Sequence, residues 1–189
     1  AISNVIGSSI TREADYSIYT HAGPEIAVAS TKAYTSQVTL LNILAIYFAE
    51  VLETAQKSLI SKLKKEILEL PSKAEETLKS AEPIKDFAKK IYQEKDVFFL
   101  GRGVDYNTAL EASLKLKEIS YIHSEAYAAG ELKHGPIALV ENDVTVISVT
   151  TDKNLVEKTI SNIQEVISRG AKTLVVSSVE LPSNNIDFV

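Results

Sequence analysis

From residue 96 to residue 177 the sequence alternates short apolar runs with longer amphipathic stretches. The apolar runs cover residues 97–100, 144–149 and 174–177, and each has the length of a strand buried on both faces. Helical patterns cover residues 108–120 and 155–169 between them. Because parallel strands are joined by crossover helices, this order of elements predicts a parallel sheet flanked by helices. The fold class that follows is α/β.

The first part of the chain has a different pattern, with short strand candidates followed by a long helix. Residues 1–5 and 16–19 have the length and apolar character of strands. The helix is predicted to begin at Ser30 or Thr31, either of which can act as its N-cap, and to end near Leu52. Its apolar residues recur at spacings of three and four, which is typical of one helix face: Val38, Leu41, Leu44, Ala45, Phe48 and Leu52.

Residues 57–94 are predicted to be mainly helical and polar. A helical pattern covers residues 59–70, and Pro71 is expected to interrupt it. Pro83 suits the first turn of a further helix over residues 84–93. No catalytic pattern occurs in this stretch, and we interpret it as a helical connection.

Composition argues against several classes of function. The net charge is −5 and no basic block occurs, so nucleic-acid binding is not predicted. No apolar run has the length of a membrane span, so membrane binding is not predicted either. The absence of cysteine excludes disulfides and thiolate chemistry and fits a reducing compartment, for which we expect the cytoplasm. The three histidines are too dispersed to indicate a metal site.

The residues best suited to proton transfer lie between positions 111 and 136. Glu111, Lys115 and Glu118 are spaced i, i+4 and i+7, so a helix presents them on one side. His134 follows in a turn that contains Gly135 and Pro136. A carboxylate, a cation and a histidine are the groups that move protons on a small polar substrate. From the residues alone, a solvated ion-pair ladder is the alternative explanation of the three charges.

A short glycine-containing segment follows the first predicted strand of the sheet. Gly101, Arg102 and Gly103 lie between that strand and a helix, where open α/β sheets bind ligands. The segment is too short for a dinucleotide-binding motif, so we predict no nicotinamide cofactor, and no other cofactor is predicted. The alternative is that the glycines serve only the tight turn.

Three segments resemble one enzyme family: residues 20–37 (THAGPEIAVASTKAYTSQ), residues 99–118 (FLGRGVDYNTALEASLKLKE) and residues 114–136 (LKLKEISYIHSEAYAAGELKHGP). They are similar to the isomerase region of glutamine-dependent glucosamine-6-phosphate synthase, or glucosamine–fructose-6-phosphate aminotransferase (isomerizing). The run ELKHGP is specific within the wider sugar-isomerase (SIS) superfamily. The resemblance implies a fold of sugar-isomerase type and the synthesis of glucosamine-6-phosphate from fructose-6-phosphate and glutamine-derived ammonia.

The resemblance implies a role for each of the charged residues. Glu118 and Lys115 match positions that carry the sugar isomerisation, and Glu111 is then a residue that orients Lys115. His134 matches a histidine that assists opening of the sugar ring and reaches the site from the neighbouring subunit. A homodimer is therefore implied.

The same resemblance indicates residues that contact the sugar. Val28, Ala29 and Ser30 match the family's sugar-contacting turn, and the alternative for Ser30 is that it serves only as an N-cap. His21 and His123 receive no comparable role.

The resemblance also divides the chain into three parts. Residues 1–56 correspond to the C-terminal half of a first sugar-isomerase lobe, residues 57–94 to the helical connection, and residues 95–189 to a second, C-terminally truncated lobe. Both lobes are then incomplete, because the family's phosphate-binding loops, its imine-forming lysine and its glutamine-hydrolysing domain have no match in this sequence. We therefore expect the 189 residues alone to be inactive. The alternatives are a related phosphosugar isomerase or deglycase, and a regulatory domain that only binds a sugar phosphate.

Overall fold

The computed structural model describes residues 1–179, 181, 187 and 188, and contacts within the chain divide it into two units, Ala1–Leu78 and Lys79–Val189. The boundary between the units lies inside the predicted helical connection, residues 57–94.

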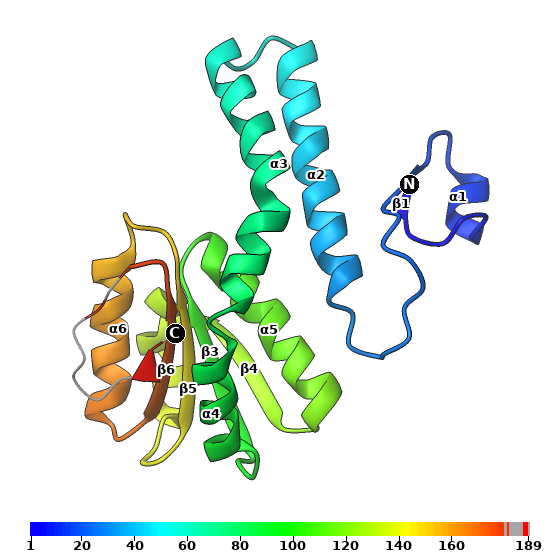
Figure 1. Cartoon of the computed structure of the whole chain (residues 1–189). Coiled ribbons are helices and arrows are strands. Elements are labelled where there is room, and N and C mark those ends of the chain that lie inside the picture. The colour runs from blue at the N-terminus through cyan, green and yellow to red at the C-terminus, as the bar shows by residue number, and fades with distance from the viewer. Residues whose placement is uncertain (180, 182–186, 189) are drawn as a thin grey trace. The chain divides into compact units, whose positions relative to one another are not determined.

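The second unit is built on a five-stranded sheet in which neighbouring strands are parallel (Figure 1). The strands lie in the order β4-β3-β5-β6-β7: β4 (His123–Ala128), β3 (Asp96–Gly101), β5 (Thr145–Thr150), β6 (Lys172–Ser177) and β7 (Asp187–Phe188). The helices of this unit are α4 (Ala81–Ile91), α5 (Val104–Ser120) and α6 (Val156–Ser168), and two 3-10 turns are η1 (Ala129–His134) and η2 (Pro136–Leu139). The predicted α/β class, with a parallel sheet flanked by helices, is confirmed.

The central strand β3 is buried on both of its faces. Val97 and Phe99 pack with Ala109 of α5, whereas Phe98 and Leu100 belong to the cluster that contains residues of α6 and η1. This alternation follows from the two-residue period of a strand. Helix α5 therefore covers one face of the sheet, and α6 with η1 covers the other (Figure 1).

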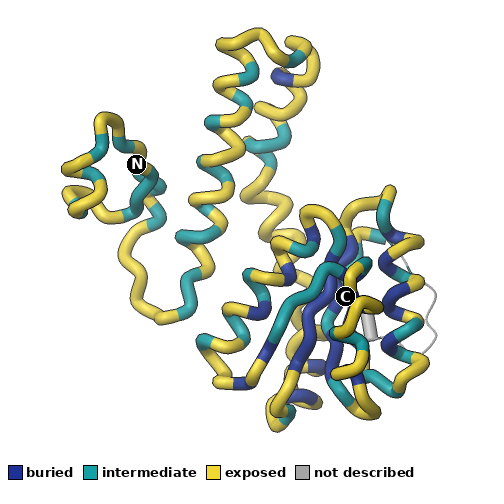
Figure 2. Tube along the Cα trace, turned by 180° about the vertical axis from the view of Figure 1, so that it is seen from behind, coloured by how far each residue is buried: buried dark blue, intermediate teal, exposed yellow. Residues whose placement is uncertain are grey.

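Helix α4 completes the face that α5 covers. Its residues Phe87 and Ile91 are buried with Leu174 of β6, and Ile147 of β5 contacts both this cluster and the α5 cluster. Figure 2 shows the buried positions gathered in the strands of this unit and on the helix faces that meet them. The core of the chain thus lies in the second unit.

The connections after β3 and β5 run in opposite directions, so a switch point lies between the carboxyl ends of these two strands. Asp105, in the first turn of α5, is 4% exposed there. Its carboxylate accepts hydrogen bonds from Thr151 N at 2.7 Å, Thr151 Oγ1 at 2.5 Å and Asp152 N at 3.3 Å. Gly101 permits this approach, because a Cβ there would lie 2.4 Å from the backbone of Asp105. The buried carboxylate therefore joins the start of α5 to the loop after β5.

We expect Asp105→Ala to lower the free energy of unfolding by about 2–3 kcal/mol, because it removes a buried carboxylate that accepts three hydrogen bonds from the loop after β5. Urea unfolding measures the loss, and hydrogen exchange at the Thr151 amide should accelerate with it. The matched control is Asp86→Ala, which removes a carboxylate that is 65% exposed and paired with Lys89. Equal losses in the two variants would contradict a structural role for Asp105.

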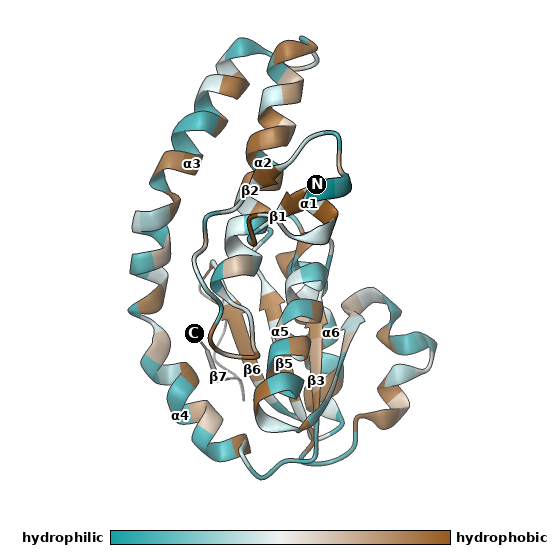
Figure 3. Cartoon of the chain, turned by 90° about the vertical axis from the view of Figure 1, so that its right-hand side faces the viewer, coloured by the Kyte–Doolittle hydropathy of each residue, from teal (hydrophilic) through white to brown (hydrophobic). Residues whose placement is uncertain are grey.

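The first unit contains a small parallel pair of strands and a helical hairpin. β1 (Ile2–Ser3) pairs with β2 (Ile18–Tyr19), and α1 (Ser9–Glu13) lies between them in sequence. α2 (Lys32–Val51) packs against α3 (Lys57–Leu78). Figure 3 shows that α2 is apolar along much of its length, yet α2 contains no buried residue. The apolar stripe predicted from residue 38 to residue 52 forms a helix but is not covered within this unit.

Several predicted elements differ from the structure in their limits. Pro71 lies inside α3 and does not end it, because its loss of one backbone hydrogen bond is local and Leu70 and Pro71 face α2 across an apolar cavity. Helix α5 begins at Val104, one turn earlier than predicted. Strand β4 was not predicted, because an edge strand with the sequence HSEAYA has no apolar run.

In the part of the chain that the structure describes, no helix has both the length and the apolar character needed to cross a membrane.

Candidate functional site

The three charged residues predicted to act together are in contact on α5. Lys115 Nζ lies 2.7 Å from Glu118 Oε2 and 3.3 Å from Glu111 Oε1. The side chains of Lys115 and Glu118 are 18% and 25% exposed. By comparison, the ion pair Lys85–Glu82 on α4 is 63% and 74% exposed. The α5 group is therefore partly buried and is less exposed than this surface pair.

This group points away from the sheet. Ala109, Ala112 and Leu116 are the α5 residues that pack on the sheet side. Glu118 follows Leu116 by two residues, which is a rotation of about 200° around the helix. Because α5 returns from the carboxyl ends of the strands to their amino ends, Glu118 in its last turn lies toward the amino edge of the sheet. The prediction that Lys115 and Glu118 line a cleft stays a prediction.

The contacts of Lys115 determine its protonation. The hydrogen bond to Glu118 is the largest influence on the pKa of Lys115 and raises it above its usual value, with Glu111 acting in the same direction and burial opposing them. The ammonium group is therefore charged at neutral pH. It can stabilise a developing negative charge or donate a proton, and it cannot serve as a base there.

His134 is the last residue of η1, and its side chain is 75% exposed. Its Nε2 lies 3.9 Å from the carboxylate of Glu131, which is 73% exposed. The turn itself is anchored, because Ala129 and Leu132 are buried in the cluster under α6. The structure therefore presents an accessible imidazole on a fixed turn.

One copy of the chain does not bring His134 and Glu118 together. η1 packs on the α6 face of the sheet, whereas Glu118 lies on the outer side of α5, which covers the opposite face. The sheet and the body of α5 separate the two side chains. A single site that uses both residues therefore requires one of them from another copy of the chain.

The predicted sugar-contacting residues lie in the loop before α2, in the first unit. Val28 is 85% exposed, and Ala29 and Ser30 are half-buried. Lys32 Nζ donates to Pro24 O at 2.7 Å and thereby closes the loop. The N-cap of α2 is Thr31 and no side chain caps the helix, so the alternative role of Ser30 as N-cap is wrong. Sugar contact by these residues stays a prediction.

The other two histidines have structural neighbours. His123 Nδ1 lies 2.8 Å from Asp96 Oδ1, and its Nε2 lies 3.7 Å from Glu125 Oε1. The ring of His21 lies 6.3 Å from that of Tyr19. Among the residues that the structure describes, no cluster of histidine and carboxylate side chains is arranged to hold a metal ion.

The segment Gly101-Arg102-Gly103 contains an interaction that sequence reasoning missed. Arg102 donates to Asn162 Oδ1 on α6 through Nη2 at 2.9 Å and Nε at 3.3 Å. Its guanidinium also lies against Gly130 of η1. The glycines around Arg102 indicate a turn at the end of β3, but the sequence gives no sign that Arg102 binds Asn162, 60 positions away.

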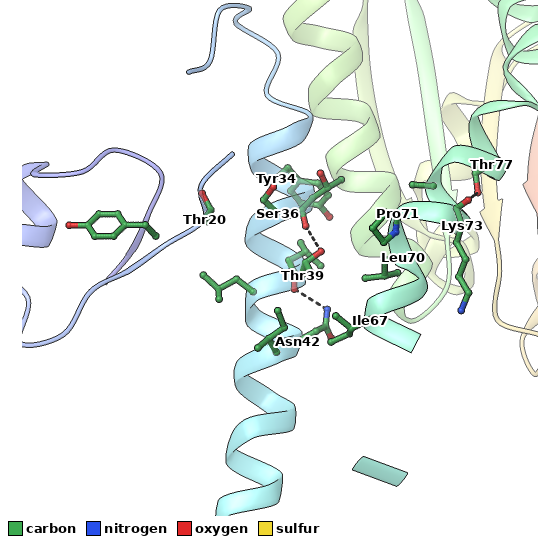
Figure 4. A pocket seen from close by; sticks show the side chains of 16 residues that line it. Thr20, Tyr34, Ser36, Thr39, Asn42, Ile67, Leu70, Pro71, Lys73 and Thr77 are labelled. Carbon is green, nitrogen blue, oxygen red and sulfur yellow. Dashed lines mark hydrogen bonds between the residues drawn. The ribbon is translucent and has the colours of Figure 1, made fainter. Parts of the chain in front are cut away.

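A cavity of about 760 Å³ lies in the first unit, between α2 and α3 (Figure 4). Its lining is mostly apolar and includes Ile43, Ile67, Leu70 and Pro71. The charged residue in that lining, Lys73, is bound to carboxylates of its own helix. None of the predicted site residues lines this cavity, and its lining contains no group of charged residues like that on α5.

The chain is similar in sequence to one protein family and to named enzymes of two organisms. The family model described as SIS domain matches residues 1–47 and 90–183. The glutamine–fructose-6-phosphate aminotransferase [isomerizing] of Clostridium perfringens is 59% identical over 174 residues, which cover 92% of this chain and 28% of the relative. The protein of the same name from Thermococcus kodakarensis is 48% identical over 180 residues, covering 95% of this chain and 30% of the relative.

A solved structure is similar over the whole chain. It is the C-terminal domain of glucosamine-fructose-6-phosphate aminotransferase from Francisella tularensis, with a TM-score of 0.93 and 38% identity. The match covers 100% of this chain and 54% of that one. The chain thus spans less than a third of the curated relatives and about half of the solved domain.

Proposed function

The chain belongs to the SIS domain family, and we propose that it is part of the isomerase region of an enzyme that makes glucosamine-6-phosphate from fructose-6-phosphate and glutamine-derived ammonia. The names of its relatives and its similarity to a C-terminal aminotransferase domain support this substrate class. The observation that carries the proposal is the contact of 2.7 Å between Lys115 and Glu118, two part-buried charges on one helix.

Glu118 is the proposed base of the isomerisation. Converting a 2-ketose to a 2-amino aldose requires that one proton leave C1 and that one proton be delivered to C2. A carboxylate placed over the C1–C2 bond can take the first proton and return it to the second carbon. The net reaction consumes ammonia and releases water, so no redox cofactor is needed.

Lys115 is the proposed electrostatic partner of that base. As the proton leaves C1, negative charge develops toward the substituent on C2 and its neighbouring hydroxyl groups. A permanently charged ammonium, 2.7 Å from the base, can stabilise that charge or donate a proton to a hydroxyl. Glu111, at 3.3 Å, fixes the direction of the Lys115 side chain.

His134 is proposed to open the sugar ring in the site of a partner copy. Its exposure and its position across the sheet from Glu118 support a site shared between two subunits. A two-fold homodimer then contains two equivalent sites, because each copy contributes His134 to the other. An imidazole can both accept and donate a proton through its ring nitrogens, as ring opening requires.

The remaining parts of the proposal concern substrate binding and supply. Val28, Ala29 and Ser30 contact the sugar from the loop before α2, whose first helical N–H groups lack a side-chain cap. Ammonia comes from glutamine through a domain that corresponds to other parts of the relatives. The reaction belongs in the cytoplasm, in keeping with the absence of cysteine.

The direct test uses the full-length enzyme that contains this chain. We expect it to form glucosamine-6-phosphate from fructose-6-phosphate only when glutamine or ammonium is supplied, and we expect the isolated 189 residues to form none. Product is measured by chromatography after incubation with ¹⁵N-amide glutamine, which places the label on C2 of the product.

Two outcomes would contradict this assignment. Turnover of a sugar phosphate without a nitrogen donor would indicate a phosphosugar isomerase. Binding of fructose-6-phosphate without turnover would indicate a regulatory domain. Product formation by the isolated chain would overturn the expectation that it is inactive alone.

A further inference from the structure

The turn η1, which ends in His134, is fixed to the rest of the second unit at both of its ends. At its start, Ala129 is fully buried beside Val166 of α6. Near its end, Leu132 is 1% exposed in the same cluster. These apolar contacts hold the backbone on α6, but Glu131, Lys133 and His134 are exposed polar residues. The direction of His134 therefore depends on further contacts.

The first such contact is made by Arg102. Its guanidinium is held by Asn162 of α6 through two hydrogen bonds, at 2.9 and 3.3 Å. A Cβ added to Gly130 would lie 3.1 Å from both terminal nitrogens of Arg102 and 3.3 Å from the carbon between them. The flat guanidinium therefore lies directly against the glycine backbone. Arg102 thus connects the end of β3, the helix α6 and the start of η1.

The second contact is made by Lys133, the residue before His134. Its Nζ lies 2.9 Å from Glu165 Oε1 on α6. The other carboxylate oxygen, Oε2, is buried and has no hydrogen-bond partner among the described residues. Glu165 is 23% exposed, so this carboxylate is more protected than that of Glu82 on α4, whereas Lys133 is as exposed as Lys85, at 63%. The contact restrains the backbone immediately before the imidazole.

Both contacts converge on one side of α6. Asn162, Glu165 and Val166 are spaced i, i+3 and i+4, so they share a helix face that meets η1. We propose that Arg102, held by Asn162, and Glu165, acting through Lys133, are positioning residues that fix the direction of His134. This inference rests on the proposed function, because it assumes that His134 acts on the sugar of a partner subunit.

The need for such residues follows from the exposure of His134. A side chain that reaches another subunit has few contacts of its own to define where it points, and His134 has one carboxylate at 3.9 Å. A misplacement of about 1 Å in a reacting group can reduce a rate by roughly 10²-fold. The contacts of Arg102 with Gly130 and of Lys133 with Glu165 restrain the turn on either side of Leu132, and so fix the direction of the exposed His134 ring.

The test compares two substitutions in the full-length enzyme, each on a different contact. Gly130→Ala should push Arg102 away without strain in the backbone, since Gly130 does not have the positive φ that excludes other residues. Glu165→Gln should weaken the contact with Lys133 while keeping the shape of the side chain. Each is expected to lower kcat by roughly 10- to 100-fold with little change in KM. Glu157→Gln, the same change at an exposed position of α6, is the matched control and should leave kcat unchanged.

A positioning role is separated from general damage by repeating both substitutions in a His134→Ala enzyme. If Gly130 and Glu165 act through His134, their substitutions cause no further loss once the imidazole is gone. Equal losses in both backgrounds would overturn the inference and indicate damage to the fold. Normal kcat in both single variants, together with low activity of His134→Ala, would also overturn it and leave the proposed function standing. Normal activity of His134→Ala would reject the proposed role of His134 and the inference with it.

Discussion

In the full-length enzyme, Glu118→Gln is expected to lower turnover by roughly 10²–10⁴-fold, the usual contribution of a positioned general base. The amide keeps the size and hydrogen-bonding oxygen of the carboxylate, so substrate binding should change much less. The loss arises because glutamine cannot take a proton from C1. Steady-state kinetics of glucosamine-6-phosphate formation measures kcat and KM separately. A second measurement is the exchange of the C1 proton of fructose-6-phosphate with deuterated water, which should stop in the variant.

The matched control for Glu118 is Glu82 on α4. Glu82 also pairs with a lysine three residues away, Lys85, but this pair is 3.4 Å long and largely exposed. Glu82→Gln should therefore leave kcat unchanged. If Glu118→Gln is as active as Glu82→Gln, the α5 group is an ion-pair ladder and the proposed mechanism fails.

Mixing two strongly impaired full-length variants, His134→Ala and Glu118→Gln, is expected to restore part of the activity once their subunits exchange. In a mixed dimer, one site receives Glu118 from the first variant and His134 from the second, so it is intact. The other site carries both substitutions and is inactive. The mixture should therefore exceed the activity of either variant alone, because the sheet separates the two residues within one copy.

Exchange is followed with two affinity tags, one on each variant, and activity is assayed on dimers that carry both tags. The control is a mixture of His134→Ala with a differently tagged copy of itself, which should stay at the low activity of that variant. If doubly tagged dimers of the two variants form and remain inactive, each site is built from a single chain. That result would reject the shared site.

The sheet was predictable where its strands are buried on both faces. Strand β3 contains a continuous apolar run, and β5 and β6 are rich in valine, isoleucine and leucine, since both sides of each strand are covered by helices. Strand β4 was missed because it lies at the edge and its buried residue Ser124 is polar, with hydrogen bonds to Ser113 of α5. The predicted interruption at Pro71 was wrong because the packing of α3 outweighs the tendency of proline to break a helix.

The candidate site was only partly visible in the sequence. The spacing of Glu111, Lys115 and Glu118 predicts their contact, because helix geometry is local. The contact of Arg102 with Asn162 depends on how the crossover helices cover the sheet, and no local pattern encodes it. The separation of Glu118 from His134 follows from the same topology, although the two residues are only 16 positions apart in the chain.

The placement of α5 and α6 on opposite faces of the sheet has a consequence for heredity. If sites are shared, an allele that carries substitutions of both Glu118 and His134 is dominant negative. When it pairs with a normal copy, each of the two sites receives one defective group, so the normal copy is silenced as well. Two alleles with one substitution each instead complement one another. With shared sites, the layout of a single sheet would thus make two mutations in the same gene more harmful together on one copy than divided between two.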